Sequence, residues 1–216
     1  MNIEEFEDNR WRTLKQKPEF RHHAAISLIK GGSALDVGCG DGLLLRMLRE
    51  RGIEGQGVDL SETSVKICRE NGFDVHHGDF TQKPLQFGDN SIDYVVALDV
   101  LEHSYDPGTL IKEMARVARV SVIIGVPNFS SLPARIQMLF GHVPENNRAN
   151  KGHLHWFNYK VLKQLCISAG LNFGTIKMNT FFPFSLISSV VSFMPNLFAL
   201  SFVVELPKTG VHHTKS

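Results

Sequence analysis

The chain has 216 residues, of which 43% are hydrophobic and 21% charged, with a formal net charge of +1 at pH 7. This is the composition of an ordinary globular protein, and it excludes disordered, collagen-like and disulfide-rich classes. Because 23 basic residues nearly balance 22 acidic ones, no overall positive field attracts nucleic acid, and we expect no nucleic-acid partner. From its length we expect a single domain over residues 1–216, with residues 1–30 as an N-terminal cap.

The cysteines and the first residues of the chain favour a cytoplasmic protein. The cysteines are odd in number and lack CxxC spacing, so we interpret them as reduced thiols and not as bridges or zinc ligands: Cys39, Cys68 and Cys166. Residues 1–8 are acidic and lack the apolar stretch of a secretory signal. Residues 178–204 carry no charge, but two prolines interrupt them, so we expect no membrane span.

Short apolar runs alternate with helical patterns along the chain, which predicts a parallel sheet wrapped by helices. The expected strands are residues 34–37, 55–60, 74–77, 94–98, 120–126, 171–177 and 200–205. Ser61, Asp106 and Asn158 are expected to cap the helices that follow them. The predicted fold class is α/β: a Rossmann-like, doubly wound, seven-stranded, mostly parallel sheet whose last strand is antiparallel.

Two segments break this rhythm and are expected to be insertions on the substrate side: residues 128–157 and 178–198. The first contains a short apolar helix at residues 136–140, and the second contains an amphipathic helix at residues 184–194 that would cover the core. Residues 128–160 hold four basic residues against one Glu, among aromatic side chains. An RNA surface is one interpretation of that pattern, and the wall of an acceptor pocket is the one that we favour.

The first predicted strand runs into a glycine loop, Gly38-Cys39-Gly40-Asp41-Gly42. In doubly wound sheets such a loop lets a ligand approach the backbone beyond the carboxyl ends of the strands. The loop lacks the Lys and Ser/Thr of a nucleotide phosphate loop, and Leu43 stands where the dinucleotide fingerprint has its third glycine. Neither phosphate-binding motif is therefore present in full.

Four acidic residues lie at or just beyond the ends of the predicted strands: Asp36, Asp59, Asp79 and Asp99. Carboxylates beside the loop repel a pyrophosphate. S-adenosyl-L-methionine suits this pattern, because it has no phosphate, carries a sulfonium and an ammonium, and offers ribose hydroxyls to an acid at the end of the second strand. The spacing from Gly38 to Asp59 fits that acid.

At these residues the chain resembles the class I S-adenosylmethionine-dependent methyltransferases. The motifs that carry the resemblance are Leu35-Asp36-Val37-Gly38-Cys39-Gly40-Asp41-Gly42, Gly57-Val58-Asp59-Leu60-Ser61, Gly78-Asp79-Phe80 and residues 91–103. The resemblance implies that Asp36 and the loop Gly38, Cys39, Gly40 and Gly42 hold the methionine part of the cofactor. It implies further that Asp59 binds the ribose, Leu60 and Phe80 the adenine faces, Asp79 the adenine amine, Leu98 and Asp99 the amino group, and Arg21 the carboxylate.

Within that class the chain is similar to the MetW family of methionine-biosynthesis proteins. Val126-Pro127-Asn128-Phe129, Arg135-Ile136-Gln137-Met138-Leu139 and Met194-Pro195-Asn196-Leu197 carry this similarity. Two functions follow as hypotheses. One is an enzyme that methylates a small-molecule acceptor by direct in-line transfer, and the other is a cofactor-binding protein partner that regulates a homoserine acyltransferase.

The sulfonium is already an activated methyl donor, so the protein has mainly to align the acceptor and exclude water. A hydroxyl acceptor would be helped by a general base, for which the candidates are His103, His142, His153 and His155. His103 is the predicted catalytic residue because it lies just beyond the fourth strand. His153 and His155 have no Asp, Glu or Cys nearby in the sequence, so we expect no metal site.

Overall fold

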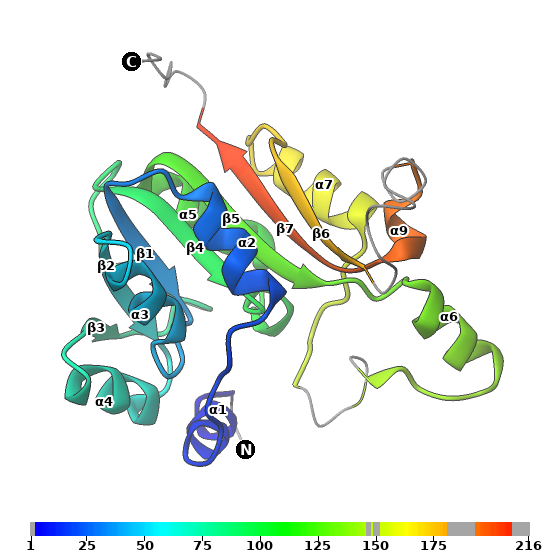
Figure 1. Ribbon diagram of the computed structural model, residues 1–216, viewed down its shortest axis with the longest axis horizontal. Coiled ribbons are helices and arrows are strands. Elements are labelled where there is room, and N and C mark those ends of the chain that lie inside the picture. Colours follow the sequence, from blue (N-terminus) through cyan, green and yellow to red (C-terminus); the bar gives the residue numbers. More distant parts are fainter. Residues whose placement is uncertain (1–2, 146–147, 149–151, 181–192, 209–216) are drawn as a thin grey trace.

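A computed structural model describes residues 3–145, 148, 152–180 and 193–208 (Figure 1). The strands are β1 (Ser33–Val37), β2 (Glu54–Asp59), β3 (Asp74–His77), β4 (Ile92–Leu98), β5 (Ala118–Pro127), β6 (Ile176–Thr180) and β7 (Ala199–Pro207). The helices are α1 (Ile3–Trp11), α2 (Phe20–Leu28), α3 (Leu43–Arg49), α4 (Glu62–Glu70), η1 (Leu101–His103), α5 (Pro107–Val117), α6 (Leu132–Leu139), α7 (Tyr159–Ser168) and α9 (Pro195–Phe198).

The strands form one seven-stranded sheet in the order β3-β2-β1-β4-β5-β7-β6. The five strands from β3 to β5 are parallel, and β7 runs antiparallel to both β5 and β6. The strand order reverses between β1 and β4, which is where open α/β sheets bind their ligands. The predicted fold class, including the antiparallel last strand, is confirmed.

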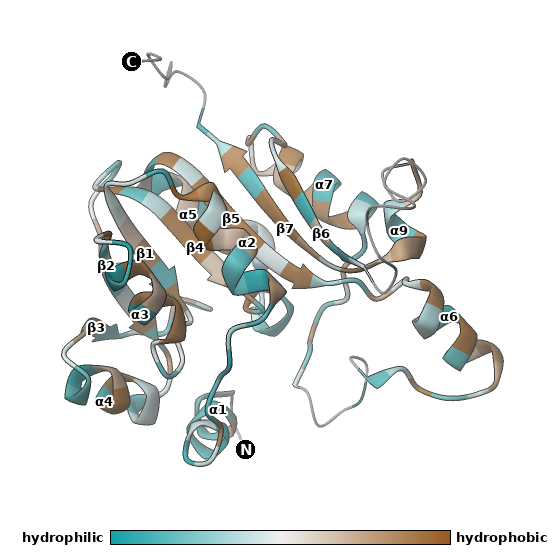
Figure 2. Ribbon diagram, in the orientation of Figure 1, coloured by the Kyte–Doolittle hydropathy of each residue, from teal (hydrophilic) through white to brown (hydrophobic). Residues whose placement is uncertain are grey.

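Helices cover both faces of the sheet (Figure 1). On one face α2, α3 and α4 bury apolar side chains against the strands, and on the other face α5 and α7 do the same. The strands in the middle of the molecule are mostly apolar, whereas the helices carry polar residues on their outer sides (Figure 2). Burial of apolar surface on both faces is what stabilises a parallel sheet, because neither face is left to water.

The predicted helix caps are confirmed by their hydrogen bonds. The side chain of Ser61 accepts a hydrogen bond from the backbone N–H of Ser64 at 3.1 Å. Asp106 and Asn158 accept the corresponding bonds at the starts of α5 and α7, at 3.0 and 2.9 Å. These local signals locate three helix starts correctly because a cap needs only a polar side chain and the next turn of backbone.

Several element boundaries differ from the prediction. The strand expected at residues 171–177 begins only at Ile176, because the backbone N–H of Gly174 bonds to Glu205 and Gly174 packs against Pro207 before regular pairing starts. Residues 178–180 therefore belong to β6 and not to an insertion. The helix expected at residues 136–140 occupies Leu132–Leu139, with proline in its first turn. Most of the helix expected at 184–194 lies outside the described residues.

Three further features set the surroundings of the site. α1 lies near the carboxyl ends of the strands, beside α4, and α6 stands away from the sheet (Figure 1). The rest of the 128–157 insertion returns past η1, where the backbone N–H of Leu154 bonds to the carbonyl of Glu102 at 2.7 Å. Among the described helices, none has the length and apolar character to cross a membrane.

Candidate functional site

The glycine loop between β1 and α3 has a backbone that side chains would disturb. Gly38, Gly40 and Gly42 have φ angles of 75°, 54° and 77°, in the left-handed region that favours glycine. A Cβ at Gly38 would lie 2.5 Å from Val100, and one at Gly40 would lie 2.3 Å from the ring of Trp11. The loop therefore needs glycine both for its conformation and for its close neighbours.

A pocket of about 610 Å³, measured to its open mouth, lies beyond the carboxyl ends of β1, β2 and β4. It is lined by eight residues that the sequence predicted for the site: Arg21, Gly38, Asp59, Leu60, Phe80, Leu98, Asp99 and His103. These residues come from α2 to η1, so the fold brings together groups spread over more than eighty positions.

Asp59 ends β2 with a buried carboxylate at the base of the pocket. One oxygen accepts a hydrogen bond from the backbone N–H of Gly40 at 2.8 Å, and the other accepts one from Ser61 at 2.9 Å. Burial raises the pKa of Asp59 to about 6, although these backbone bonds favour the charged form. Each oxygen keeps a second lone pair that can accept a hydrogen bond from a ligand hydroxyl.

Asp36 lies beneath the glycine loop and is only 4% exposed. Burial raises its pKa to about 8, and the neighbouring carboxylates of Asp59 and Asp41 raise it further. Asp41 itself accepts a hydrogen bond from the backbone N–H of Gln16 at 2.9 Å, which ties the loop to the N-terminal segment. Asp36 is thus close to the pocket but does not line it.

Arg21 and Asp99 form an ion pair inside the pocket, with Nε of Arg21 3.2 Å from Oδ2 of Asp99. Burial raises the pKa of Asp99, and the guanidinium of Arg21 opposes that rise. Asp99 has a φ of 55°, a conformation that is uncommon outside glycine and that proteins keep mainly where the surrounding structure demands it. Arg21 also pairs with Glu19 at its other side.

Two other predicted residues, Cys39 and Asp79, do not line the pocket. Cys39 is buried against Gly57, and a hydrogen bond with Cys68, together with burial, raises the pKa of its thiol. Asp79 uses its carboxylate in its own turn, where it accepts hydrogen bonds from the backbone N–H of Thr81 at 3.1 Å and from its hydroxyl at 2.6 Å. The assignment of Asp79 to the adenine amine stays a prediction, and in this structure Thr81 lines the pocket in its place.

α1 and the segment that follows it also contribute to the site, which the sequence did not predict. The pocket is also lined by Glu7, Arg10, Trp11 and Gln16. Asp8 fixes α1 in place, because its carboxylate accepts hydrogen bonds from the hydroxyl of Ser61 at 2.5 Å and from the backbone N–H of Thr63 at 3.0 Å. α1 has no strong apolar face that would have marked it, so its place over the pocket was not visible from periodicity.

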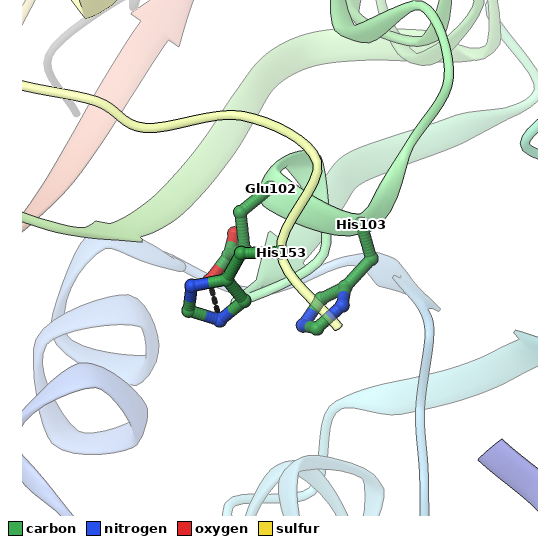
Figure 3. Close-up of side chains that lie close together, drawn as sticks. All are labelled: Glu102, His103 and His153. Atoms are coloured by element: carbon green, nitrogen blue, oxygen red, sulfur yellow. Dashed lines mark ion pairs between the residues drawn. The ribbon is translucent and has the colours of Figure 1, made fainter. Parts of the chain in front are cut away.

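His103 lies at the edge of the pocket next to two other ionisable side chains, Glu102 and His153 (Figure 3). Nε2 of His153 is 4.0 Å from Oε1 of Glu102, and the rings of His103 and His153 meet edge to face with their centroids 4.9 Å apart. Burial lowers the pKa of His103 to about 4 and raises that of Glu102 well above its usual range. His153 therefore has an acidic neighbour in space, and it was not visible from the sequence because Glu102 comes from a distant part of the chain.

The remaining histidine candidates lie elsewhere. His142 lines a separate hollow beside α6, with Gln137 and Arg148. Nε2 of His155 is 3.4 Å from the carbonyl oxygen of Tyr105. Of the four histidines considered, His103 is the one that lines the pocket of the glycine loop.

Solved structures share this fold. The magnesium protoporphyrin IX methyltransferase of Synechocystis PCC 6803 with bound S-adenosylhomocysteine is 17% identical, with a TM-score of 0.66 over 96% of this chain and 98% of that one. A SAM-dependent methyltransferase from Archaeoglobus fulgidus is 22% identical, with a TM-score of 0.63 over 87% and 91% of the two chains. The fold is thus that of the class I S-adenosylmethionine-dependent methyltransferases.

The family described as "Methionine biosynthesis protein MetW" matches residues 20–191. The chain belongs to the MetW family, as the resemblance in its sequence predicted. A ubiquinone biosynthesis O-methyltransferase of Azoarcus sp. (strain BH72) is 28% identical over 172 residues, which cover 72% of this chain and 70% of that protein. The relative of that name from Methylococcus capsulatus is 33% identical over 100 residues, or 44% of this chain and 42% of the relative, less than half of its length. These names agree with the fold: the chain is a methyltransferase whose cofactor is S-adenosylmethionine.

Proposed function

We propose that this chain transfers the methyl group of S-adenosylmethionine to an oxygen atom of a small-molecule acceptor. The observation that carries the proposal is the single pocket in which the glycine loop, Asp59 and the pair of Arg21 with Asp99 meet. The names of the O-methyltransferase relatives support an oxygen as the acceptor atom. The cytoplasm is the predicted location.

The charges in the pocket suit the two ends of this cofactor. Its amino-acid end is a zwitterion, so the guanidinium of Arg21 would bind the carboxylate while Asp99 binds the ammonium. Asp59 would accept hydrogen bonds from the ribose hydroxyls with the lone pairs that Gly40 and Ser61 leave unused. Leu60 and Phe80 would contact the adenine, since both are apolar and line the same pocket.

The chemistry then needs alignment more than activation. The acceptor oxygen attacks the methyl carbon in line with the C–S bond, which breaks and leaves its electron pair on sulfur, so S-adenosylhomocysteine departs as a neutral thioether. α1 with Trp11 covers the glycine loop and would exclude water from the sulfonium. His103 would contact the acceptor and accept a hydrogen bond from its hydroxyl.

Calorimetric titration of S-adenosylmethionine and S-adenosylhomocysteine tests the cofactor assignment. We expect Asp59→Asn to weaken both by roughly 30- to 100-fold, because it replaces a charged acceptor by an amide beside two N–H donors. The matched control is Asp93→Asn, a buried carboxylate that bonds Ser33 and Arg119 at the opposite end of the sheet. Equal affinity in the Asp59 and Asp93 variants would contradict the cofactor assignment. Turnover is tested separately, by measuring release of S-adenosylhomocysteine across a panel of hydroxylated acceptors.

A second candidate function follows from family membership alone. The chain belongs to a family described by methionine biosynthesis. In this second hypothesis it binds the cofactor and acts as the partner that regulates a homoserine acyltransferase. One structural neighbour is the methyltransferase in a complex with the Trm112 methyltransferase activator of Haloferax volcanii, at 17% identity and a TM-score of 0.68. The expected result is that the two proteins co-purify and that S-adenosylmethionine changes the rate of the acyltransferase. Failure to form a complex at micromolar concentrations would exclude this function.

A further inference from the structure

Glu102, His103 and His153 form a cluster at the edge of the pocket. His103 is the predicted catalytic residue, His153 was one of the other candidate bases, and Glu102 was not predicted to have a role. Each side chain offers one ligand atom, and these atoms all lie within 4.8 Å of one another. Glu102 and His103 are neighbours on η1, whereas His153 comes from the insertion that crosses in front of it (Figure 3). We call these three residues the Glu102 cluster.

Backbone hydrogen bonds hold the two parts of the cluster together. The main-chain carbonyl of Glu102 accepts hydrogen bonds from the backbone N–H groups of Leu154 at 2.7 Å and His155 at 3.1 Å. On the other side, Nδ1 of His103 is 3.2 Å from the carbonyl oxygen of Gly152. His153 therefore sits between anchored residues, and its approach to Glu102 is built into the path of the chain.

The carboxylate of Glu102 is the feature that calls for a ligand. The residue is 1% exposed, and within the described part of the chain neither of its oxygens has a hydrogen-bond partner. The nearest basic group is Nε2 of His153 at 4.0 Å, which is too far for a hydrogen bond. Buried carboxyl oxygens normally have partners, so two without any among the described residues leave lone pairs with which Glu102 could hold a ligand.

The orientation of His103 leaves it a lone pair to donate. A carbonyl oxygen can only accept, so Nδ1 carries the proton in the contact with Gly152 and Nε2 is unprotonated. Histidines that bind metals commonly donate their other N–H to a backbone carbonyl, which fixes the tautomer and the plane of the ring. The contact of His103 with Gly152 has that form.

We propose that Glu102, His103 and His153 bind a divalent transition-metal ion, with Zn²⁺ as the ion that best suits two imidazoles and one carboxylate. A tetrahedral ion with bonds of about 2.1 Å places its ligand atoms roughly 3.4 Å apart. Ligand atoms that lie within 4.8 Å of one another therefore need to close by up to about 1.4 Å. Three protein ligands leave at least one position open. Since His103 lines the cofactor pocket, that position faces the space where the acceptor would bind.

The use of the ion rests on the proposed function, whereas its binding does not. An acceptor hydroxyl that occupies the open position releases its proton to water, because the ion lowers the pKa of a bound O–H group. The resulting oxygen anion forms the C–O bond as the C–S bond of the sulfonium breaks, with a methyl ether, S-adenosylhomocysteine and one proton as products. His103 is then a ligand, and the acceptors would be small molecules with a hydroxyl able to coordinate a metal.

The test is calorimetric titration of Zn²⁺ into chelator-treated protein in the absence of cofactor. We expect one ion per chain, bound about 10- to 100-fold more weakly by Glu102→Gln and by His153→Gln. His155→Gln is the matched control, because it is a histidine of the same segment outside the cluster, and its affinity should equal that of the unchanged chain. The absorption spectrum of bound Co²⁺ should be altered in Glu102→Gln and unaltered in His155→Gln.

Two results would overturn the proposal: folded protein that takes up no stoichiometric Zn²⁺, or Zn²⁺ affinity that is equal in all three variants. Circular dichroism and thermal unfolding show whether each variant is folded, and His153→Gln, on a partly exposed residue, keeps the test decisive if Glu102→Gln does not fold. S-adenosylhomocysteine is titrated into the same preparations. Protein that binds the cofactor product but no Zn²⁺ contradicts this inference alone, whereas the reverse contradicts the proposed function alone.

Discussion

The ring of Trp11 lies directly against the backbone of Gly40, so close that a Cβ at Gly40 would come within 2.3 Å of it. Trp11 is 6% exposed although it lies near the start of the chain. The contact joins α1 to the loop that, in the proposed function, holds the methionine part of the cofactor. The N-terminal segment is therefore a wall of the site and not only a cap on the sheet.

Gly40→Ala is expected to unfold more readily and to lose cofactor affinity. The substitution combines a φ of 54° with the collision against Trp11, and the conformational part alone costs about 1 kcal/mol. Gly52→Ala is the matched control, since Gly52 has a φ of 68° but no atom within 4 Å of its Cβ position. Thermal unfolding and S-adenosylhomocysteine titration measure both effects, and equal loss in the two variants would show that the Trp11 contact is unimportant.

Trp11 should report cofactor binding by fluorescence. The chain has two tryptophans, Trp11 in the pocket and Trp156, which is 49% exposed. In Trp156→Phe we expect S-adenosylhomocysteine to change the emission, and in Trp11→Phe we expect the response to disappear. A response that persists without Trp11 would place the cofactor elsewhere.

Asp8→Ala, which removes the bonds from Ser61 and Thr63 that fix α1, should speed cofactor dissociation about 10-fold. Lys15→Ala should leave the dissociation rate unchanged.

Arg21→Ala should weaken binding of S-adenosylmethionine by about 10- to 100-fold. The substitution removes the cation that pairs with Asp99 at 3.2 Å and leaves a carboxylate without its counter-charge in the pocket. Adenosine, which lacks the amino-acid end, should bind the variant and the unchanged chain equally well. Arg46→Ala, an exposed arginine on α3, serves as the control. Equal weakening for adenosine would mean that Arg21 supports the fold of the pocket and not the amino-acid end.

His22 should make the fold sensitive to acid. Burial lowers its pKa from 6.5 to about 4, and Nδ1 accepts a hydrogen bond from the backbone N–H of Glu19 at 3.1 Å, which requires the unprotonated ring. Because the folded-state pKa is the lower one, this stability is present above about pH 6.5 and is lost as the pH falls toward 4, by about 3 kcal/mol in all.

Urea unfolding across this pH range checks the prediction. His22→Asn keeps an acceptor near the position of Nδ1 but cannot be protonated, so its stability should fall less steeply than that of the unchanged chain between pH 6.5 and 4. His23→Asn, on the exposed neighbour, should follow the unchanged chain. If stability fell equally steeply with pH in all three proteins, protonation of His22 would not destabilise the fold and the prediction would be wrong.

Much of the fold was predictable because its signals are local. The seven strands, the caps at Ser61, Asp106 and Asn158, and the glycine loop each depend on a few consecutive residues. The strand predicted at residues 171–175 was wrong because the contact that decides this segment is not local. An apolar run there resembles a strand, but Gly174 meets Pro207 across the sheet, and nothing near position 174 in the sequence shows it.

The sequence by itself determined the order of elements, and with it the set of residues that gather at the carboxyl ends of β1, β2 and β4, because parallel strands end at a common edge. Only the tertiary structure decided that Trp11 covers Gly40, that Asp79 turns back to its own loop, and that Glu102 lies beside His153. These contacts join residues up to fifty-one positions apart through the paths of irregular segments. Such a path is set by scattered backbone hydrogen bonds and packing, which leave no period or spacing in the sequence to predict them from.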